Sequence, residues 1–156
     1  MKRTFLLALV LLGLVAAAAS VQAVAENEEM AEDEYLTKAD AFLKSLIDNE
    51  LFLMEMQELI DAVDAGDEGL IILDVRPVGY DEAHIPGSIN VPFTELVPDM
   101  EMVPADKKIA VVCTFDASSV FSVSVLRIFG DRDAWVVVNG IPGWLEAGRE
   151  LVASEM

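Results

Sequence analysis

Residues 70–77 read Leu70-Ile71-Ile72-Leu73-Asp74-Val75-Arg76-Pro77, a continuous apolar run that ends in polar residues. Two further runs follow the same plan: Ile109 to Val112 ends in Cys113, and Ala134 to Val138 ends in Asn139-Gly140. Runs that are apolar on both alternating faces, with helical segments between them, are typical of a parallel sheet covered on both sides. The sequence therefore predicts an α/β fold with Asp74, Cys113 and Asn139 at the carboxyl ends of strands, where the active crevice of such sheets lies.

Helical patterns precede and separate these runs. Thr37 to Asp40 has the spacing of a capping box, and apolar residues recur at helical intervals from Leu36 to Ile47, so we expect a helix there. We expect a short strand at Leu51-Phe52-Leu53. Two further helices are predicted, one from Met56 to Val63 that stops at Ala65-Gly66 and one from about Ser118 to Phe129 that stops at Gly130.

The first 25 residues have the features of a secretory signal peptide. Lys2 and Arg3 give a positive start, and an uncharged stretch runs from Phe5 to Ala25. Small residues predict cleavage after Ala25 or Ala23. An uncleaved membrane anchor is the alternative, since a stretch of this length can just span a bilayer. We expect an acidic lead-in with a short helix at residues 26–50, the main domain at residues 51–152, and a periplasmic or secreted location with no membrane contact after cleavage.

Composition excludes several classes of protein. The chain has 156 residues, 54% of them hydrophobic, and its 10 Lys+Arg against 28 Asp+Glu give a formal net charge of −18. That length fits one compact domain. The acidity excludes nucleic acid as a partner, since a phosphate backbone needs a basic surface. Because Cys113 is the single cysteine and His84 the single histidine of the sequence, we expect no intramolecular disulfide and no zinc site.

Cys113 occupies a place where a thiol can become reactive. When a strand, a cysteine, a short loop and a helix follow one another, backbone N–H groups of the loop and of the first helical turn converge near the sulfur. These groups stabilise a thiolate, which is the nucleophilic form, and offer a cradle to an anion. The alternative is a buried, inert cysteine.

Several segments together resemble the single-domain rhodanese family. They are Leu73-Asp74-Val75-Arg76-Pro77, then Tyr80-Asp81-Glu82-Ala83-His84-Ile85-Pro86-Gly87-Ser88-Ile89-Asn90-Val91-Pro92, then Cys113, then Val138-Asn139-Gly140-Ile141-Pro142-Gly143-Trp144. The resemblance covers roughly residues 51–151. It implies a five-stranded, mainly parallel sheet flanked by helices on both faces. It also implies that Cys113 takes sulfane sulfur from a small donor such as thiosulfate as a persulfide and passes it to a thiol or cyanide-like acceptor, with no metal or organic cofactor.

The loop after Cys113 departs from the family pattern. That pattern is close to Cys-x-x-Gly-x-Arg, and here Asp116 stands at the glycine position and Ser118 at the arginine position. Both changes lower the positive potential, and a carboxylate beside the sulfur repels a thiosulfate dianion. Asp116 is alternatively a helix N-cap, a role that Ser118 and Ser119 share. The residues expected to contact substrate are Thr114, Phe115, Asp116, Ala117, Ser118, Ser119 and Arg76. Of these, the hydroxyls of Thr114, Ser118 and Ser119 can donate hydrogen bonds, Phe115 forms an apolar wall, and Arg76 either supplies a cation or ties its strand to neighbouring loops.

Two functions are compatible with these residues, and a third is disfavoured. The first is a secreted sulfurtransferase or sulfane-sulfur carrier that forms a persulfide on Cys113, with polysulfide or a low-molecular-weight persulfide as donor in place of thiosulfate. The second is an inactive rhodanese-like binding or sensing module. The third, a cysteine-dependent phosphatase or arsenate reductase, needs an arginine six residues after the cysteine, where this chain has Ser119. No segment marks an interface, so the sequence leaves the oligomeric state open.

Overall fold

The computed structural model describes residues 34–154. The predicted signal peptide at residues 1–25 and the first part of the acidic lead-in lie outside the described residues. The chain divides into two compact units, residues 1–39 and residues 40–156. Residues 34–39 of the first unit are helical, and in the second unit residues 40–48 are helical and lead into the sheet domain. No helix within residues 34–154 is long and apolar enough to cross a membrane.

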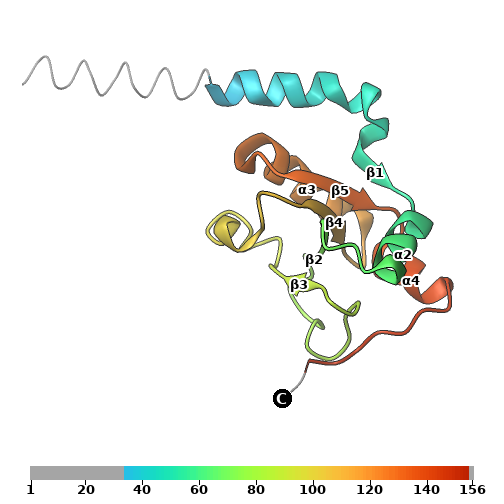
Figure 1. Cartoon of the computed structure of the whole chain (residues 1–156). Helices are drawn as coiled ribbons and strands as arrows, with labels where there is room; N and C mark the ends of the chain where they lie inside the picture. The colour runs from blue at the N-terminus through green and yellow to red at the C-terminus, as the bar shows by residue number, and fades with distance from the viewer. Residues whose placement is uncertain (1–33, 155–156) are drawn as a thin grey trace, which may run out of the picture. The chain divides into compact units, whose positions relative to one another are not determined.

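One five-stranded sheet organises the described part of the second unit (Figure 1). Its strands are β1 (Leu53–Met54), β2 (Leu70–Asp74), β3 (Ile89–Asn90), β4 (Lys108–Val112) and β5 (Asp133–Val137), and they lie in the order β1-β5-β4-β2-β3. All four neighbouring pairs are parallel, with Ile71 opposite Ile109 and Ile109 opposite Ala134. The predicted five-stranded α/β fold is therefore confirmed.

Helices cover both faces of this sheet (Figure 1). The helical elements after residue 48 are η1 (Glu50–Phe52), α2 (Met56–Ala65), η2 (Met100–Met102), α3 (Asp116–Gly130) and α4 (Gly140–Glu146). Val123 and Leu126 of α3 pack in one core with Val111, whereas Leu59 of α2 and Trp144 of α4 pack in a second core with residues of the opposite strand face. This alternation along β4 explains why its sequence is apolar without interruption.

The segment before β1 is a turn and not the strand that the sequence predicts. The strand predicted at Leu51-Phe52-Leu53 begins at Leu53, because Glu50, Leu51 and Phe52 have φ angles of 50°, 60° and 54° and form the left-handed turn η1. Such angles are costly for residues other than glycine. Burial of Phe52 offsets this cost, since its ring stacks on Phe42 with centroids 5.8 Å apart and meets the ring of Trp135 edge-on.

Arg127 of α3 completes the packing of η1 against the domain. Its guanidinium carbon lies 3.5 Å from the centre of the Phe52 ring, its Nε donates to the carbonyl of Ala134 at 2.7 Å, and its Nη2 donates to Asp133 at 2.7 Å. Burial lowers the pKa of Arg127, and the charge and hydrogen bond of Asp133 oppose that shift. A single arginine thus connects η1, α3 and the start of β5.

A buried ion pair holds the end of β2. The carboxylate of Asp74 is fully buried and accepts from Nε and Nη2 of Arg76 at 2.9 Å and 2.6 Å. Nη2 of Arg76 also donates to the carbonyl of Ala83 at 2.7 Å, and Nδ2 of Asn90 donates to the carbonyl of Asp74 at 2.7 Å. The ion pair therefore ties β2 to the loop at Ala83, and the Asn90 amide ties the same strand to β3.

The start of α4 lies against the backbone of Cys113. The N–H of Ile141 donates to the carbonyl oxygen of Cys113 at 3.0 Å. A β-carbon placed on Gly140, which has φ of 34°, would lie 2.2 Å from that oxygen. Only glycine fits here, because a real β-carbon does not approach a backbone oxygen so closely.

We expect Gly140→Ala to lower the free energy of unfolding by at least ~2 kcal/mol, because the methyl group must displace the Cys113 backbone. Denaturant unfolding measures this loss. Gly148→Ala is the matched control: it also has positive φ, of 76°, but nothing lies within 4 Å of its added β-carbon. The control should lose only about 1 kcal/mol. Equal losses in the two variants would contradict the close approach as the cause.

We expect Arg76→Met to lower the free energy of unfolding by about 3–5 kcal/mol, because Asp74 is then left buried without its cation. Lys44→Met breaks the exposed pair with Asp40 and should cost about 0–1 kcal/mol in the same unfolding experiment. If Arg76→Met costs no more than this control, the buried pair does not hold the end of β2.

Candidate active site

Cys113 lies at the carboxyl edge of the sheet, directly after β4. Its side chain is buried, with 4% of the residue exposed, and a two-residue connection leads from it to α3. The residue before it, Val112, accepts a hydrogen bond from the N–H of Val75 at 3.0 Å, and Cys113 itself accepts from Ile141. The carbonyl groups of both Val112 and Cys113 are therefore held in place, the first by the residue after β2 and the second by α4.

The first turn of α3 follows the cysteine at once. Phe115 is the N-cap residue, its backbone is extended, and no side chain caps the helix, so the N-cap role expected for Asp116, Ser118 or Ser119 is wrong. The helix begins two residues before the predicted start, which places Asp116 inside its first turn. Free N–H groups of this turn carry partial positive charge, and the Asp116 carboxylate at the same end is attracted to it.

The loop and the first turn bring together six of the residues predicted to contact substrate. Thr114, Phe115, Asp116 and Ala117 are exposed and Ser118 is half-buried. Ser119 is buried, and its hydroxyl has no hydrogen-bond partner among the described residues. A buried hydroxyl without a partner retains its capacity to donate a hydrogen bond.

Arg76, the seventh residue predicted to contact substrate, lies after β2 at the same edge of the sheet. Within residues 34–154 its guanidinium donates to Asp74 and to the carbonyl of Ala83. These are the contacts of a residue that ties its strand to a neighbouring loop. Its positive charge is largely matched by the buried carboxylate of Asp74, with which it forms an ion pair of 2.6 Å.

Exposed apolar side chains follow three neighbouring strands at this edge. Phe115, after β4, is 73% exposed; Val78 follows β2 and Phe93 follows β3, and both are exposed as well. Val78 and Phe93 were not singled out from the sequence. Their position just after the carboxyl ends of parallel strands is the signal that finds them, because such loops meet at one edge.

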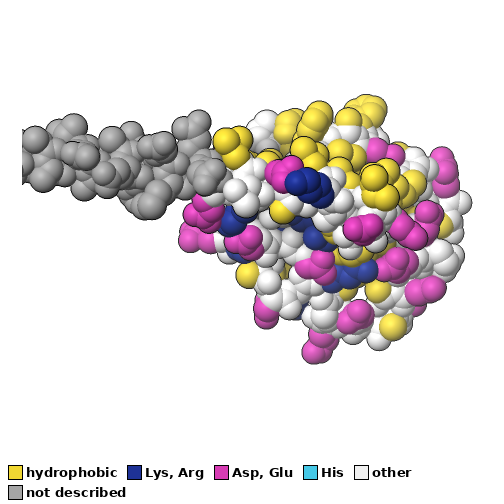
Figure 2. Space-filling model, turned by 90° about the horizontal axis from the view of Figure 1, so that it is seen from above, with side chains coloured by type: hydrophobic (Ala, Val, Ile, Leu, Met, Phe, Trp, Pro, Cys, Tyr) yellow, Lys and Arg dark blue, Asp and Glu magenta, His cyan; other side chains and the backbone are white. Residues whose placement is uncertain are grey.

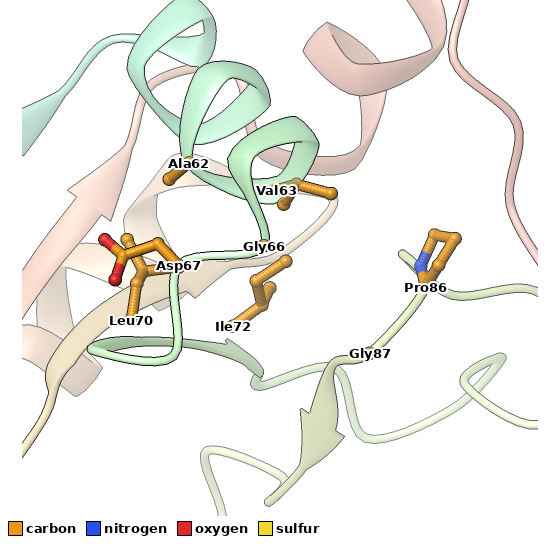
Figure 3. Close-up of a pocket in the computed structure, with 8 residues that line it drawn as sticks. All are labelled: Ala62, Val63, Gly66, Asp67, Leu70, Ile72, Pro86 and Gly87. Carbon is orange, nitrogen blue, oxygen red and sulfur yellow. The ribbon is translucent and has the colours of Figure 1, made fainter.

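Other parts of the described structure offer neither a metal centre nor a second thiol. Within residues 34–154 no three His, Cys, Asp or Glu side chains are grouped so that they could hold a metal ion. A cavity of about 180 Å³ lies beside the carboxyl end of α2, with Pro86 and Gly87 across from Ala62 and Val63 (Figure 3). Its one carboxylate, Asp67, accepts from the N–H of Gly69 at 2.8 Å. No cysteine lines this cavity, and because Cys113 is the single cysteine of the sequence, the thiol chemistry of this chain rests on it.

Two curated proteins are similar to this chain over about half of their own length. The chain is 28% identical over 96 residues to "Putative sulfur carrier protein YrkF" of Bacillus subtilis, covering 61% of this chain and 50% of that protein. It is also 28% identical over 123 residues to "HTH-type transcriptional regulator Rv0324" of Mycobacterium tuberculosis, covering 77% and 53%. The chain thus spans about half the length of these curated relatives.

A solved structure and a family model indicate the same family for this chain. A rhodanese-related protein from Thermoplasma volcanium superposes with a TM-score of 0.57 at 30% identity, over 64% of this chain and 96% of that one. The family model of the rhodanese-like domain matches residues 55–147, which include β2 to β5, the Cys113 loop and α4. With a parallel sheet, a cysteine at its carboxyl edge and a match over more than half of its length, the chain belongs to the rhodanese-like domain family.

Proposed function

We propose that the protein is a secreted rhodanese-like sulfurtransferase or sulfane-sulfur carrier that forms a persulfide on Cys113. The observation that carries this proposal is the placement of the buried Cys113 thiol between β4 and the first turn of α3, inside the segment that matches the family. The name of the Bacillus subtilis relative as a sulfur carrier supports the same chemistry. The apolar stretch at residues 5–25 and the basic residues before it support the secretory part of the proposal.

The reaction consists of two nucleophilic substitutions at sulfur. The Cys113 thiolate attacks the outer sulfur of a polysulfide or a small persulfide; the donor S–S bond breaks, and its electron pair leaves with the rest of the donor, as a shorter polysulfide anion or as a thiolate. A thiolate or cyanide acceptor then attacks the outer sulfur of the Cys113 persulfide, and Cys113 leaves as a thiolate. Free N–H groups of the first turn of α3 follow Cys113 closely in the chain and are hydrogen-bond donors for a bound anion.

The residues of the loop favour a donor that carries less charge than thiosulfate, such as a small persulfide or a singly protonated polysulfide. The Asp116 carboxylate lies in the first turn of α3 and opposes the approach of a thiosulfate dianion. Exposed Phe115 offers apolar contact to a less charged donor. In place of a guanidinium, the hydroxyls of Thr114, Ser118 and Ser119 supply neutral donors, and Ser119 is the one whose hydroxyl is buried without a partner in the described structure.

The second candidate is an inactive binding or sensing module. Asp116 and Ser118 favour it, because both lower the positive potential with which an anionic donor would be held. A relative named as a transcriptional regulator also shows that similar chains occur within proteins of another kind.

We expect intact-mass measurement to show that the mature protein gains one sulfur atom on incubation with polysulfide. The gain should map to Cys113, disappear on addition of cyanide or a thiol, and be absent in Cys113→Ser. If the free thiol gains no sulfur from polysulfide or from thiosulfate, the protein is the inactive module.

We expect the double variant Asp116→Gly, Ser118→Arg to use thiosulfate about tenfold faster, which corresponds to ~1.4 kcal/mol of barrier, because it removes a negative charge and adds a positive one beside the thiol. The rate of thiocyanate formation from cyanide measures this change. Ala105→Arg with Asp106→Gly makes the same change in net charge before β4, at the opposite edge of the sheet, and is the control.

Raised salt should speed the wild-type reaction with thiosulfate more than that of the double variant, since screening weakens the repulsion. An unchanged rate in Asp116→Gly, Ser118→Arg, or an equal gain in the control variant, would show that the charge of the loop does not select the donor.

A further inference from the structure

An apolar groove runs between the segment at residues 42–53 and α3. The groove has a cavity volume of about 260 Å³, and eight of its nine lining residues are apolar. Leu43, Leu46 and Leu51 lie on one side, and Val120, Val123 and Ser124 of α3 lie on the other. The groove therefore joins the helical residues before η1 to the helix that follows Cys113.

The side chains at the mouth of this groove are uncovered. Leu43 is 62% exposed, Leu51 is 55% exposed and Val120 is 45% exposed. A contiguous set of exposed apolar side chains that line a concave surface is typical of an interaction site, whereas single exposed apolar residues are ordinary. In Figure 2 the hydrophobic side chains gather toward one side of the view, while acidic side chains are spread over much of the remaining surface.

Acidic residues border the groove, although no charged residue lines it. Exposed Glu50 directly precedes Leu51, and exposed Asp48 lies three residues before it. Exposed Asp116 lies one helical turn before Val120 on the same side of α3. The basic side chains nearest to the groove residues in the sequence are Lys44 and Arg127, and they are paired with Asp40 at 2.6 Å and with Asp133 at 2.7 Å. The border is therefore negative and the interior is apolar.

We propose that this groove binds an amphipathic segment of a partner protein, with apolar side chains toward the groove and lysine or arginine at its flanks. Apolar contact supplies affinity and the acidic border selects the charge of the partner. A second copy of this chain fits less well, because it carries the same acidic border and a formal net charge of −18. This binding requires no persulfide and is independent of the sulfur chemistry proposed above.

The groove would hold such a partner close to the Cys113 loop. Val120 lies four residues after Asp116, which is about 6 Å along the axis of α3. Asp116 in turn lies three residues after Cys113. A segment bound in the groove therefore positions its parent protein beside the loop that contains the nucleophile.

The test uses the full chain and synthetic peptides of 14 residues. The probe is a leucine–lysine peptide with the leucines on one helical face; one matched peptide replaces every lysine with glutamate, and the other replaces every leucine with glutamine. We expect the leucine–lysine peptide to bind, the glutamate peptide not to bind, and the glutamine peptide to bind at least about tenfold more weakly. Amide NMR shifts should change at residues 42–53 and 120–124.

Variants separate the groove from general attraction to an acidic surface. Leu43→Gln with Val120→Thr should weaken binding of the leucine–lysine peptide about tenfold. Val97→Thr, which changes an exposed valine outside the groove, should leave binding unchanged. Equal binding of the leucine–lysine and glutamine peptides would overturn the proposal. So would a dimer that forms without peptide and is lost in Leu43→Gln, Val120→Thr, because the occupant would then be a second copy.

Cys113→Ser distinguishes failure of this proposal from failure of the proposed function. We expect it to bind the leucine–lysine peptide as the wild type does, because Cys113 does not line the groove. Absence of peptide binding by a protein that still loads sulfur would overturn the groove proposal alone. If the wild-type protein binds the peptide but never loads sulfur, the groove proposal is supported and the protein is an inactive binding module.

Discussion

The closest constraint in the domain is the backbone contact between the start of α4 and Cys113. Gly140 lies so near the Cys113 carbonyl that no side chain fits, and the N–H of Ile141 bonds to the same oxygen. This contact fixes where β5 can end and where α4 can begin. It also fixes the direction in which the chain leaves β4, and with it the origin of α3. Trp144, buried in the core between α4 and the sheet, secures the same arrangement from the other end of α4.

The sheet was predictable where its strands are long and buried on both faces. β2, β4 and β5 each appear in the sequence as a continuous apolar run, and the end of α2 was found because Gly66 supplies the left-handed residue that follows it. β3 has two residues and is defined by its pairing with β2, so no period could reveal it. The aromatic side chain of Phe52 favours a strand, but its packing with Phe42, Trp135 and Arg127 overrides that tendency.

The candidate site also has a part that the sequence predicts and a part that it does not. Thr114 to Ser119 lie near Cys113 because they follow it in the chain, so local sequence was sufficient to find them. The start of α3 was misplaced by two residues, because serines are favoured N-caps and here an extended Phe115 takes that position. The apolar groove, in contrast, depends on contacts between segments that are distant in the sequence, residues 42–53 and α3. A single sequence shows which residues are present, but it does not show which distant residues come into contact.

The first and last strands in the order of the sheet, β1 and β3, are its shortest strands. β1 and β3 each have two residues, so either edge exposes few unpaired N–H and C=O groups. A foreign strand needs a longer row of such groups to extend a sheet. The domain is therefore poorly suited to recognition by strand addition and poorly suited to seeding cross-β stacks, and its side-chain surfaces are left as the places where other molecules can be recognised.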